Sequence, residues 1–481
     1  MHRRFAFLAV MLVAGCSHQP KYVRPDLPTA SVYAPDAWPA SDGPRAVEIA
    51  WRSFFDDPRL QALIARALEH NRDLRVAVLR IDEARGQYRI QRADRLPTVN
   101  ATAGATRSRS EGFDGTGAVT GNRFDVGASV ASFELDFWGR VRSLTESARA
   151  NYLSTIYGQR AFQISLVADV AEAYLTEREL DARIAFAERT VQSRVRALEI
   201  GRLRLDAGVT SALDYRQIET LLTQAQSELA SLQLQRAQTR NTLEFLVGGP
   251  VAAPLPPPLP MASQGIVENV SPGLPSELLT NRPDILEAEE QLRAANADVG
   301  AARAAFFPQI SLTGALGFAS TALGSLFGSD ALTWSFGGNA ALPVFDGGRT
   351  RGNLDVSVAR GGIATAEYER VIQNAFREVS DRLAARRWLA DRLTAQQREA
   401  AAQRERAELA TLRYRNGVAN FLEVLDAERE LFAAEQQVLL TRREQLTNAV
   451  ELYVALGGGL ESGTPVIGPF NNWFAREQSR N

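Results

Sequence analysis

The chain contains two related copies of one long unit, displaced by 209 residues. Landmarks of the first copy return in the same order in the second: Gly139-Arg140 as Gly348-Arg349, Gly208-Val209 as Gly417-Val418, and Gly248-Gly249 as Gly457-Gly458. Solenoid repeats have periods of roughly 20–50 residues, far shorter than this one. The sequence therefore predicts a two-fold pseudo-repeat in which each copy builds a similar piece of structure.

The N-terminus has the layout of a bacterial secretory signal. Two arginines (Arg3 and Arg4) precede an apolar run over residues 5–13, and two small residues then precede Cys16. This ending resembles a lipobox, so we expect cleavage after residue 15 and a lipid, palmitate included, on Cys16. The next residue is Ser17 rather than the aspartate that retains such lipoproteins in the inner membrane, which favours the outer membrane. The alternative is a buried N-terminal helix with a chance cysteine.

Composition divides the rest of the chain. Proline, aspartate and serine are frequent after Cys16, and six prolines between residues 250 and 260 form a stiff linker. A net charge of −2 gives no sign of nucleic-acid binding. We therefore expect a signal peptide (1–15), a lipid-anchored N-terminal arm (16–56), repeat 1 (57–249), a Pro-rich linker (250–280), repeat 2 (281–459) and a C-terminal tail (460–481).

Each copy reads as a helix, two strands, a very long helix, a tight turn and another long helix. The first helix is expected over about residues 59–95. Proline is absent from residues 98–249, which permits a helix from about residue 140 to 206 that spans about 100 Å. Coiled-coil spacing is carried by Ile184, Val191, Leu198 and Leu205.

Gly208 and Gly417 follow the long helices and are expected to be left-handed helix ends. Short turns at these glycines predict two antiparallel helix pairs. In the second copy, Gly361-Gly362 lies inside the long helix. Because each glycine costs about 1 kcal/mol of helix propensity, we expect a kink or a close contact there, and not an unbroken helix over 347–415.

Alternation of apolar and polar residues predicts four strands. In the first copy they lie near residues 98–106 and 124–130, separated by a loop over 108–121, and in the second near 310–316 and 332–342. Strands of about ten residues suit a tilted membrane crossing, with apolar side chains outward and polar ones inward. Aromatic residues near their ends are candidates for an interfacial girdle: Phe113, Phe137, Trp138 and Phe345.

Four strands cannot close a barrel, and open sheet edges are not tolerated in lipid. We therefore expect self-association: two copies give eight strands and a filled interior, and three or more leave an aqueous lumen. The alternative is a soluble α+β protein with a small sheet.

Several motifs resemble the lipidated outer-membrane efflux factors of the TolC/OprM (NodT-type) family. They are Arg282-Pro283-Asp284-Ile285, the run Ala301-Ala302-Arg303-Ala304-Ala305-Phe306-Phe307-Pro308-Gln309-Ile310-Ser311-Leu312-Thr313-Gly314, Tyr414-Arg415-Asn416-Gly417-Val418, and Leu422-Glu423-Val424-Leu425-Asp426. The resemblance covers essentially the whole mature chain. It implies an α+β membrane protein: a homotrimer with a twelve-stranded β-barrel, four strands from each chain, continued by a long α-helical coiled-coil periplasmic tunnel.

The same resemblance implies a passive outer-membrane conduit of a tripartite efflux system, which exports small molecules. The implied partners are a periplasmic adaptor protein, an inner-membrane pump of the RND type and outer-membrane lipid. The resemblance also implies that the adaptor docks at the two helix tips, at Gly208, Val209, Gly417 and Val418. A conduit for type I protein secretion and a cell-envelope scaffold are the alternatives. The exported compound cannot be read from the sequence.

No catalytic motif, nucleotide-binding motif or metal-ligand cluster is present in the sequence, and the three histidines are scattered. We therefore expect no enzyme activity and no cofactor besides the covalent lipid on Cys16.

The resemblance places a periplasmic gate at Leu422, Glu423 and Asp426. The two acids lie three residues apart on one helix face. Three chains would bring six carboxylates together, and like charges in a narrow ring repel, raise each other's pKa and attract cations. Asp214 is the copy-one counterpart of Glu423. Arg413 and Arg415 are expected either to pair with these acids or, as the favoured interpretation, to cap a helix C-terminus.

Overall fold

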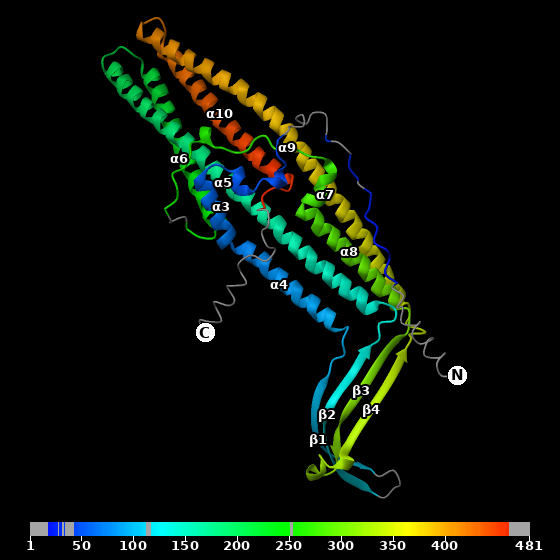
Figure 1. Cartoon of the computed structure of the whole chain (residues 1–481). Coiled ribbons are helices and arrows are strands. Elements are labelled where there is room, and N and C mark those ends of the chain that lie inside the picture. Colours follow the sequence, from blue (N-terminus) through cyan, green and yellow to red (C-terminus); the bar gives the residue numbers. More distant parts are fainter. Residues whose placement is uncertain are drawn as a thin grey trace. The chain divides into compact units, whose positions relative to one another are not determined.

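The computed structural model describes residues 18–26, 28–30, 33, 43–111, 117–250 and 254–460 (Figure 1). The signal peptide, Cys16, Phe113 and nearly all of the C-terminal tail lie outside these residues. Lipidation of Cys16 therefore stays a prediction, and so do the segment boundaries.

The chain divides into two compact units, and each takes segments from both copies. Unit 1 comprises Met1–Asp26, Arg80–Ile156 and Glu287–Arg370. Unit 2 comprises Leu27–Leu79, Tyr157–Leu286 and Val371–Asn481.

Unit 1 contains one antiparallel sheet in the order β1-β2-β3-β4 (Figure 1). Its strands are β1 (Asn100–Glu111), β2 (Ala118–Glu134), β3 (Gln309–Ser320) and β4 (Leu332–Ala341). Two short 3₁₀ turns, η4 (Leu323–Ser325) and η5 (Ser329–Ala331), lie between β3 and β4. The pairing of β2 with β3 contains a register shift between Val130 and Phe133.

The loop predicted over residues 108–121 is too long. The ladder continues through Ser108 opposite Gly121 and Arg109 opposite Thr120. Apolar alternation ends near Thr106, and beyond it both faces of the strands are polar. Periodicity cannot signal a strand with two polar faces, although its backbone hydrogen bonds are equally available.

The strand register separates the sheet into two chemically different faces. On one face Ala103 lies opposite Val126, Val126 opposite Phe318, and Phe318 opposite Leu332. Trp334 and Phe336, on the same face of β4, have 76% and 72% of their surface exposed. The other face presents small and polar residues: Gly104, Asp125, Gly127, Ser129, Ala315, Gly317, Ala319, Thr333 and Ser335. The predicted alternation is confirmed, and within the described residues the outer edges of β1 and β4 have no strand partner.

Four helices cross the division between the units: α4 (Arg72–Ala93), α5 (Arg140–Asp206), α8 (Pro283–Ala304) and α9 (Arg349–Arg415). The bounds predicted for α5 are confirmed. The interruption expected at Gly361-Gly362 is wrong, because α9 is one continuous 67-residue helix. A Cβ at Gly362 would meet no atom within 4 Å, and one at Gly361 would meet only Val299 Cγ2 at 3.9 Å. No close contact requires either glycine.

Unit 2 contains α2 (Trp51–Phe54), α3 (Pro58–His70), α6 (Ala212–Val247), α7 (Leu278–Asn281) and α10 (Phe421–Ala455), with short 3₁₀ turns η1 (Ala46–Glu48), η2 (Met261–Ser263) and η3 (Pro275–Glu277). Its core includes the fully buried Trp51, Phe54, Phe55, Leu60, Leu63, Ile64, Tyr174 and Tyr453. Phe54 stacks on Tyr453 with ring centroids 3.9 Å apart. Among the described residues, no helix is both long enough and apolar enough to span a bilayer.

The two predicted helix pairs form antiparallel hairpins, α5 with α6 and α9 with α10 (Figure 1). In the first hairpin, Leu180 and Ala187 pack with Leu232. In the second, Ala407 and Ala410 pack with Val424 and Ala427.

The single helix expected over residues 59–95 is wrong, since it is broken at Asn71 between α3 and α4. Asn71 is buried and extended, with ψ of 131°. Its Oδ1 accepts a hydrogen bond from the Leu74 amide (2.8 Å), and its Nδ2 donates to the Leu246 carbonyl (2.9 Å). The side chain thus caps α4 and ties the break to α6.

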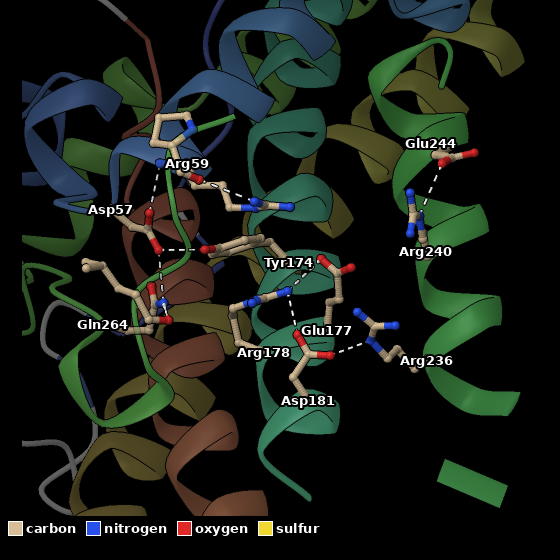
Figure 2. A network of polar contacts seen from close by, with 12 residues as sticks. Asp57, Arg59, Tyr174, Glu177, Arg178, Asp181, Arg236, Arg240, Glu244 and Gln264 are labelled. Carbon is tan, nitrogen blue, oxygen red and sulfur yellow. Dashed lines mark hydrogen bonds and ion pairs between the residues drawn. The ribbon is translucent and has the colours of Figure 1, made fainter. Parts of the chain in front are cut away.

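A polar network joins the Pro-rich linker to the helices of unit 2 (Figure 2). The fully buried Asp57 carboxylate accepts hydrogen bonds from the Arg59 amide (2.8 Å), the Tyr174 hydroxyl (2.7 Å) and Gln264 Nε2 (3.0 Å). Burial, and then the neighbouring Asp57 carboxylate, raise the pKa of Tyr174 well above its ordinary value. Since a buried carboxylate needs such donors, the network fixes the linker to α3 and α5.

Candidate functional site

The tip of the first hairpin is a turn closed by backbone hydrogen bonds. Gly208 has a φ of 70°, so the predicted left-handed end is confirmed. Its amide donates to the Leu205 carbonyl (2.9 Å), and the Val209 amide donates to the Arg204 carbonyl (2.8 Å). These two bonds form a Schellman motif, which satisfies carbonyls at the end of α5.

A capping box begins α6 directly after this turn. Ser211 Oγ accepts a hydrogen bond from the Asp214 amide (3.1 Å), while Asp214 Oδ2 accepts from the Ser211 amide (3.2 Å), the Ser211 hydroxyl (2.8 Å) and the Thr210 hydroxyl (3.1 Å). These bonds, those from Ser211 foremost, lower the pKa of Asp214. Asp214 therefore stabilises its own turn rather than simply facing solvent.

The tip of the second hairpin has the same backbone. Gly417 has a φ of 72°, as predicted. Its amide donates to the Tyr414 carbonyl (3.0 Å), and the Val418 amide donates to the Arg413 carbonyl (3.0 Å). Asn420 then caps α10, because its Oδ1 accepts a hydrogen bond from the Glu423 amide (3.2 Å).

Both acids of the predicted gate form ion pairs with arginines of the same hairpin. Glu423 Oε1 lies 3.0 Å from Arg413 Nε. Asp426 lies 2.6 Å from Arg406 Nη2 and 2.8 Å from Arg429 Nη2. The favoured interpretation of Arg413 as only a helix cap is therefore wrong. Because Arg406 and Arg413 belong to α9 and the acids to α10, these pairs tie the end of one helix to the start of the next.

A cavity of about 720 Å³ lies between the two hairpin tips, within unit 2. The Arg204 guanidinium, on its first-hairpin wall, lies 5.3 Å from the centroid of the Tyr414 ring on its second. Leu422, the third predicted gate residue, is also on the wall and has 45% of its surface exposed. The apolar lining includes Ile200, Ile218, Phe421, Val424 and Leu425.

A partly buried acid, Glu428, lines the same cavity. Burial raises the pKa of the Glu428 carboxyl, and the nearby Arg194 acts in the opposite direction. Burial also lowers the pKa of Arg194, whose Nη1 donates to the Leu221 carbonyl (2.5 Å).

The sequence placed the acids but missed most of their partners. Arg429 was within reach of sequence reasoning, because it follows Asp426 by three residues on one helix face. Arg406 and Arg413 meet the acids only because α9 and α10 fold back on each other, so their pairing required the hairpin register.

The family of outer membrane efflux proteins has a model that matches residues 63–249 and 274–458. The chain belongs to this family. It is 42% identical to the probable efflux pump outer membrane protein TtgC of Pseudomonas putida over 94% of each chain. It is 39% identical to the cation efflux system protein CusC of Escherichia coli O157:H7, over 94% of this chain and 98% of CusC.

A solved structure supports the same family. The open state of the Neisseria gonorrhoeae MtrE outer membrane channel is 39% identical, with a TM-score of 0.85, over 93% of this chain and 99% of that one. The predicted function as an outer-membrane efflux channel, and the predicted location in the outer membrane, are thereby confirmed. The comparisons favour efflux over protein secretion, and the family consists of channel proteins rather than enzymes.

Proposed function

We propose that three copies of this chain form a passive conduit across the outer membrane, the exit duct of a tripartite efflux system. Each copy contributes four strands to a twelve-stranded barrel, which is continued by a tunnel built from the long helices. A periplasmic adaptor protein joins this duct to an inner-membrane pump of the RND type. No energy-converting motif is present in the sequence, so the pump drives transport.

The observation that carries this proposal is the four-stranded sheet with one apolar face and two unpartnered outer edges. Unpaired N–H and C=O groups in hydrocarbon cost several kcal/mol each, so a membrane sheet has to close. Joining β1 of one copy to β4 of the next closes it. Eight strands enclose a filled interior, while twelve leave space for an aqueous lumen lined by the polar face.

The proposed gate is the start of α10, at Leu422, Glu423 and Asp426. Its ion pairs to Arg413 and Arg406 support a closed arrangement, because they hold α10 against α9. Splaying the hairpin requires these pairs to separate. Each acid has an arginine partner in its own chain, so the mouth of a trimer is a ring of paired charges rather than of bare carboxylates.

The proposed adaptor-docking points are the two turns, at Gly208, Val209, Gly417 and Val418. Val209 and Val418 have 64% and 70% of their surfaces exposed, which suits an apolar contact with a partner. Adaptor binding there lies next to the proposed gate, so docking and opening are linked. Cys16 carries the lipid that anchors the chain.

The exported compounds are small molecules, and the pump selects them. Relatives are named for efflux of toluene, solvents, antibiotics and cations. Such different cargoes within one family support a shared duct without a specific binding site.

Conductance of the purified protein in planar lipid bilayers tests the proposal. A conduit gives discrete current steps after insertion, and a scaffold gives none. Protein heated until its oligomers dissociate is the matched control, and it should be silent. Absence of steps from intact protein that has inserted into vesicles would contradict conduction.

A further inference from the structure

Residues 18–26, here called the arm, run antiparallel to α8 within unit 1. The His18 ring stacks on Phe307 beyond the end of α8, with centroids 4.4 Å apart. Further along, Asn296 Nδ2 donates to the Pro20 carbonyl (2.9 Å). Arg24 reaches Glu289, near the start of α8. The arm residue number rises as the α8 number falls, so contact extends along the whole segment.

The arm meets one face of α8. The contacting positions are Glu289, Arg293, Asn296 and Gly300, whose 4-3-4 spacing places them on a single stripe. At Gly300, an added Cβ would lie 2.8 Å from Gln19 Cα, closer than real Cβ atoms approach. The stripe therefore has a gap in side chains where the arm backbone passes.

Glu289 is the chemical centre of this contact. Its side chain is only 3% exposed. It accepts hydrogen bonds from the Tyr22 hydroxyl (3.1 Å), from Arg24 Nε (3.3 Å) and Nη2 (2.5 Å), and from Arg293 Nη2 (2.8 Å). Two of its three partners belong to the arm, and Arg24 presents the forked geometry that suits a carboxylate. If the arm left, a buried carboxylate would lose most of its compensation.

Tyr22 supports the same geometry from the arm. The Arg293 guanidinium lies 5.1 Å from the centroid of its ring. Burial, and then the Glu289 charge, raise the pKa of the Tyr22 hydroxyl to about 12. The hydroxyl therefore keeps its proton at neutral pH and remains a donor to Glu289.

We infer that the stripe on α8 is a docking site for the arm and that Glu289 is its latch, so the segment behind the proposed lipid anchor is a fixed strap and not a free tether. The strap ends at His18, beside Phe307 and Trp138, whose rings lie where α8 gives way to β3 and where β2 gives way to α5. If the sheet crosses the membrane as proposed, docking sets the level at which the lipid enters. The latch itself does not depend on that proposal.

Limited trypsin digestion of the full mature protein tests the strap, because Lys21 lies in the middle of the arm and is exposed. Cleavage after Lys21 releases a body that begins at Tyr22, which intact mass spectrometry identifies. The wild type should resist at this bond. Arg24→Gln should be cut on the order of tenfold faster or more, because breaking a buried ion pair raises the open population that the protease attacks.

Gly300→Ala is a second, steric variant that leaves every charge in place. It should also expose Lys21, and the nearby Ser143 hydroxyl can rotate away from the new methyl group. The double variant Arg24→Gln/Glu289→Gln should be cut no faster than the faster of its two single variants, because both remove the same contact. Gln291→Ala, at an exposed position on α8, is the matched control and should digest like the wild type.

Rapid cleavage of the wild type at Lys21 would overturn the strap. So would resistance of both Arg24→Gln and Gly300→Ala. Arg24→Gln alters only the arm, so a folding defect of the body does not obscure the result. The assay requires neither conductance nor oligomer formation, so its outcome stands apart from the proposed conduit.

Discussion

The two hairpin tips share a backbone and differ in what their acids do. Each has a left-handed glycine, the same pair of turn hydrogen bonds and a capping side chain at the start of the next helix. Asp214 and Glu423 occupy equivalent positions in the two copies. Asp214 closes its own capping box, whereas Glu423 leaves its cap to Asn420 and pairs with Arg413.

The difference extends one helical turn further. Asp426 is held by Arg406 and Arg429. The residues at the three equivalent positions in the first copy are uncharged: Gln217, Ala197 and Thr220. The pairing of α9 with α10 by charge is thus specific to the second hairpin. The turn geometry is common to both tips, and the proposed gate depends on side chains that are not.

The largest effect is expected from removing the acids of the second tip. Glu423→Gln/Asp426→Asn frees the arginines of the gate and loosens α10 from α9. We expect several-fold more open-channel current in planar bilayers and a weaker preference for cations. Asp214→Asn is the matched control in the first tip and should leave both properties unchanged. Equal effects at the two tips, or none at either, would remove the distinction between them.

Substituting the turn glycines tests what the tips share. A Cβ at Gly208 or at Gly417 would meet no atom within 4 Å, so Gly→Ala costs only the left-handed backbone strain. We expect about 1–2 kcal/mol in each tip. Hydrogen exchange of the tip amides measures this local loss. A much larger cost at one tip would show that the turns are not equivalent.

Removing the cap residues separates the tips again. Ser211→Ala destroys a reciprocal capping box, while Asn420→Ala removes a single accepted hydrogen bond. A lost N-cap costs about 0.5–2 kcal/mol, and the loss should be greater for Ser211→Ala. Hydrogen exchange in the first turns of α6 and α10 gives the comparison. The reverse order would mean that Asp214 contributes nothing to its turn.

The smallest effect concerns pH. Burial raises the pKa of Glu428 in the folded protein, so the folded state binds the proton more tightly than the unfolded state. Stability from this group is therefore lost as pH rises through and above the ordinary glutamate range. Glu428→Gln should raise the melting temperature slightly at pH 8 and not at pH 4.

Glu219, the first-copy equivalent of Glu428, provides the control. It is paired with Arg216 on the exposed face of α6. Glu219→Gln should therefore give no pH-dependent gain. A gain of the same size from both variants would show that burial beside Arg194 is not the cause.

Local signals explain which parts of the fold could be predicted from the sequence. The bounds of α5 followed from the absence of proline, and Gly208 and Gly417 from the need for a left-handed residue after a helix. Asn71 was missed although asparagine is a strong cap, because the apolar pattern continued across it. The outer parts of β1 and β2 carry no apolar period at all.

The site was predictable only in part for a related reason. Resemblance indicated Glu423 and Asp426, but their α9 partners depend on how two helices fold back. Glu289 gave no signal, because its partner Arg24 lies 265 residues away. Contacts of this kind depend on tertiary packing, which neither periodicity nor composition encodes.

The oligomeric mass of the mature protein, gently extracted from membranes in detergent, tests the central proposal most directly. Native mass spectrometry should find three copies, because the edges of β1 and β4 require partners from other chains. Exclusive recovery of folded monomers would contradict a closed twelve-stranded barrel.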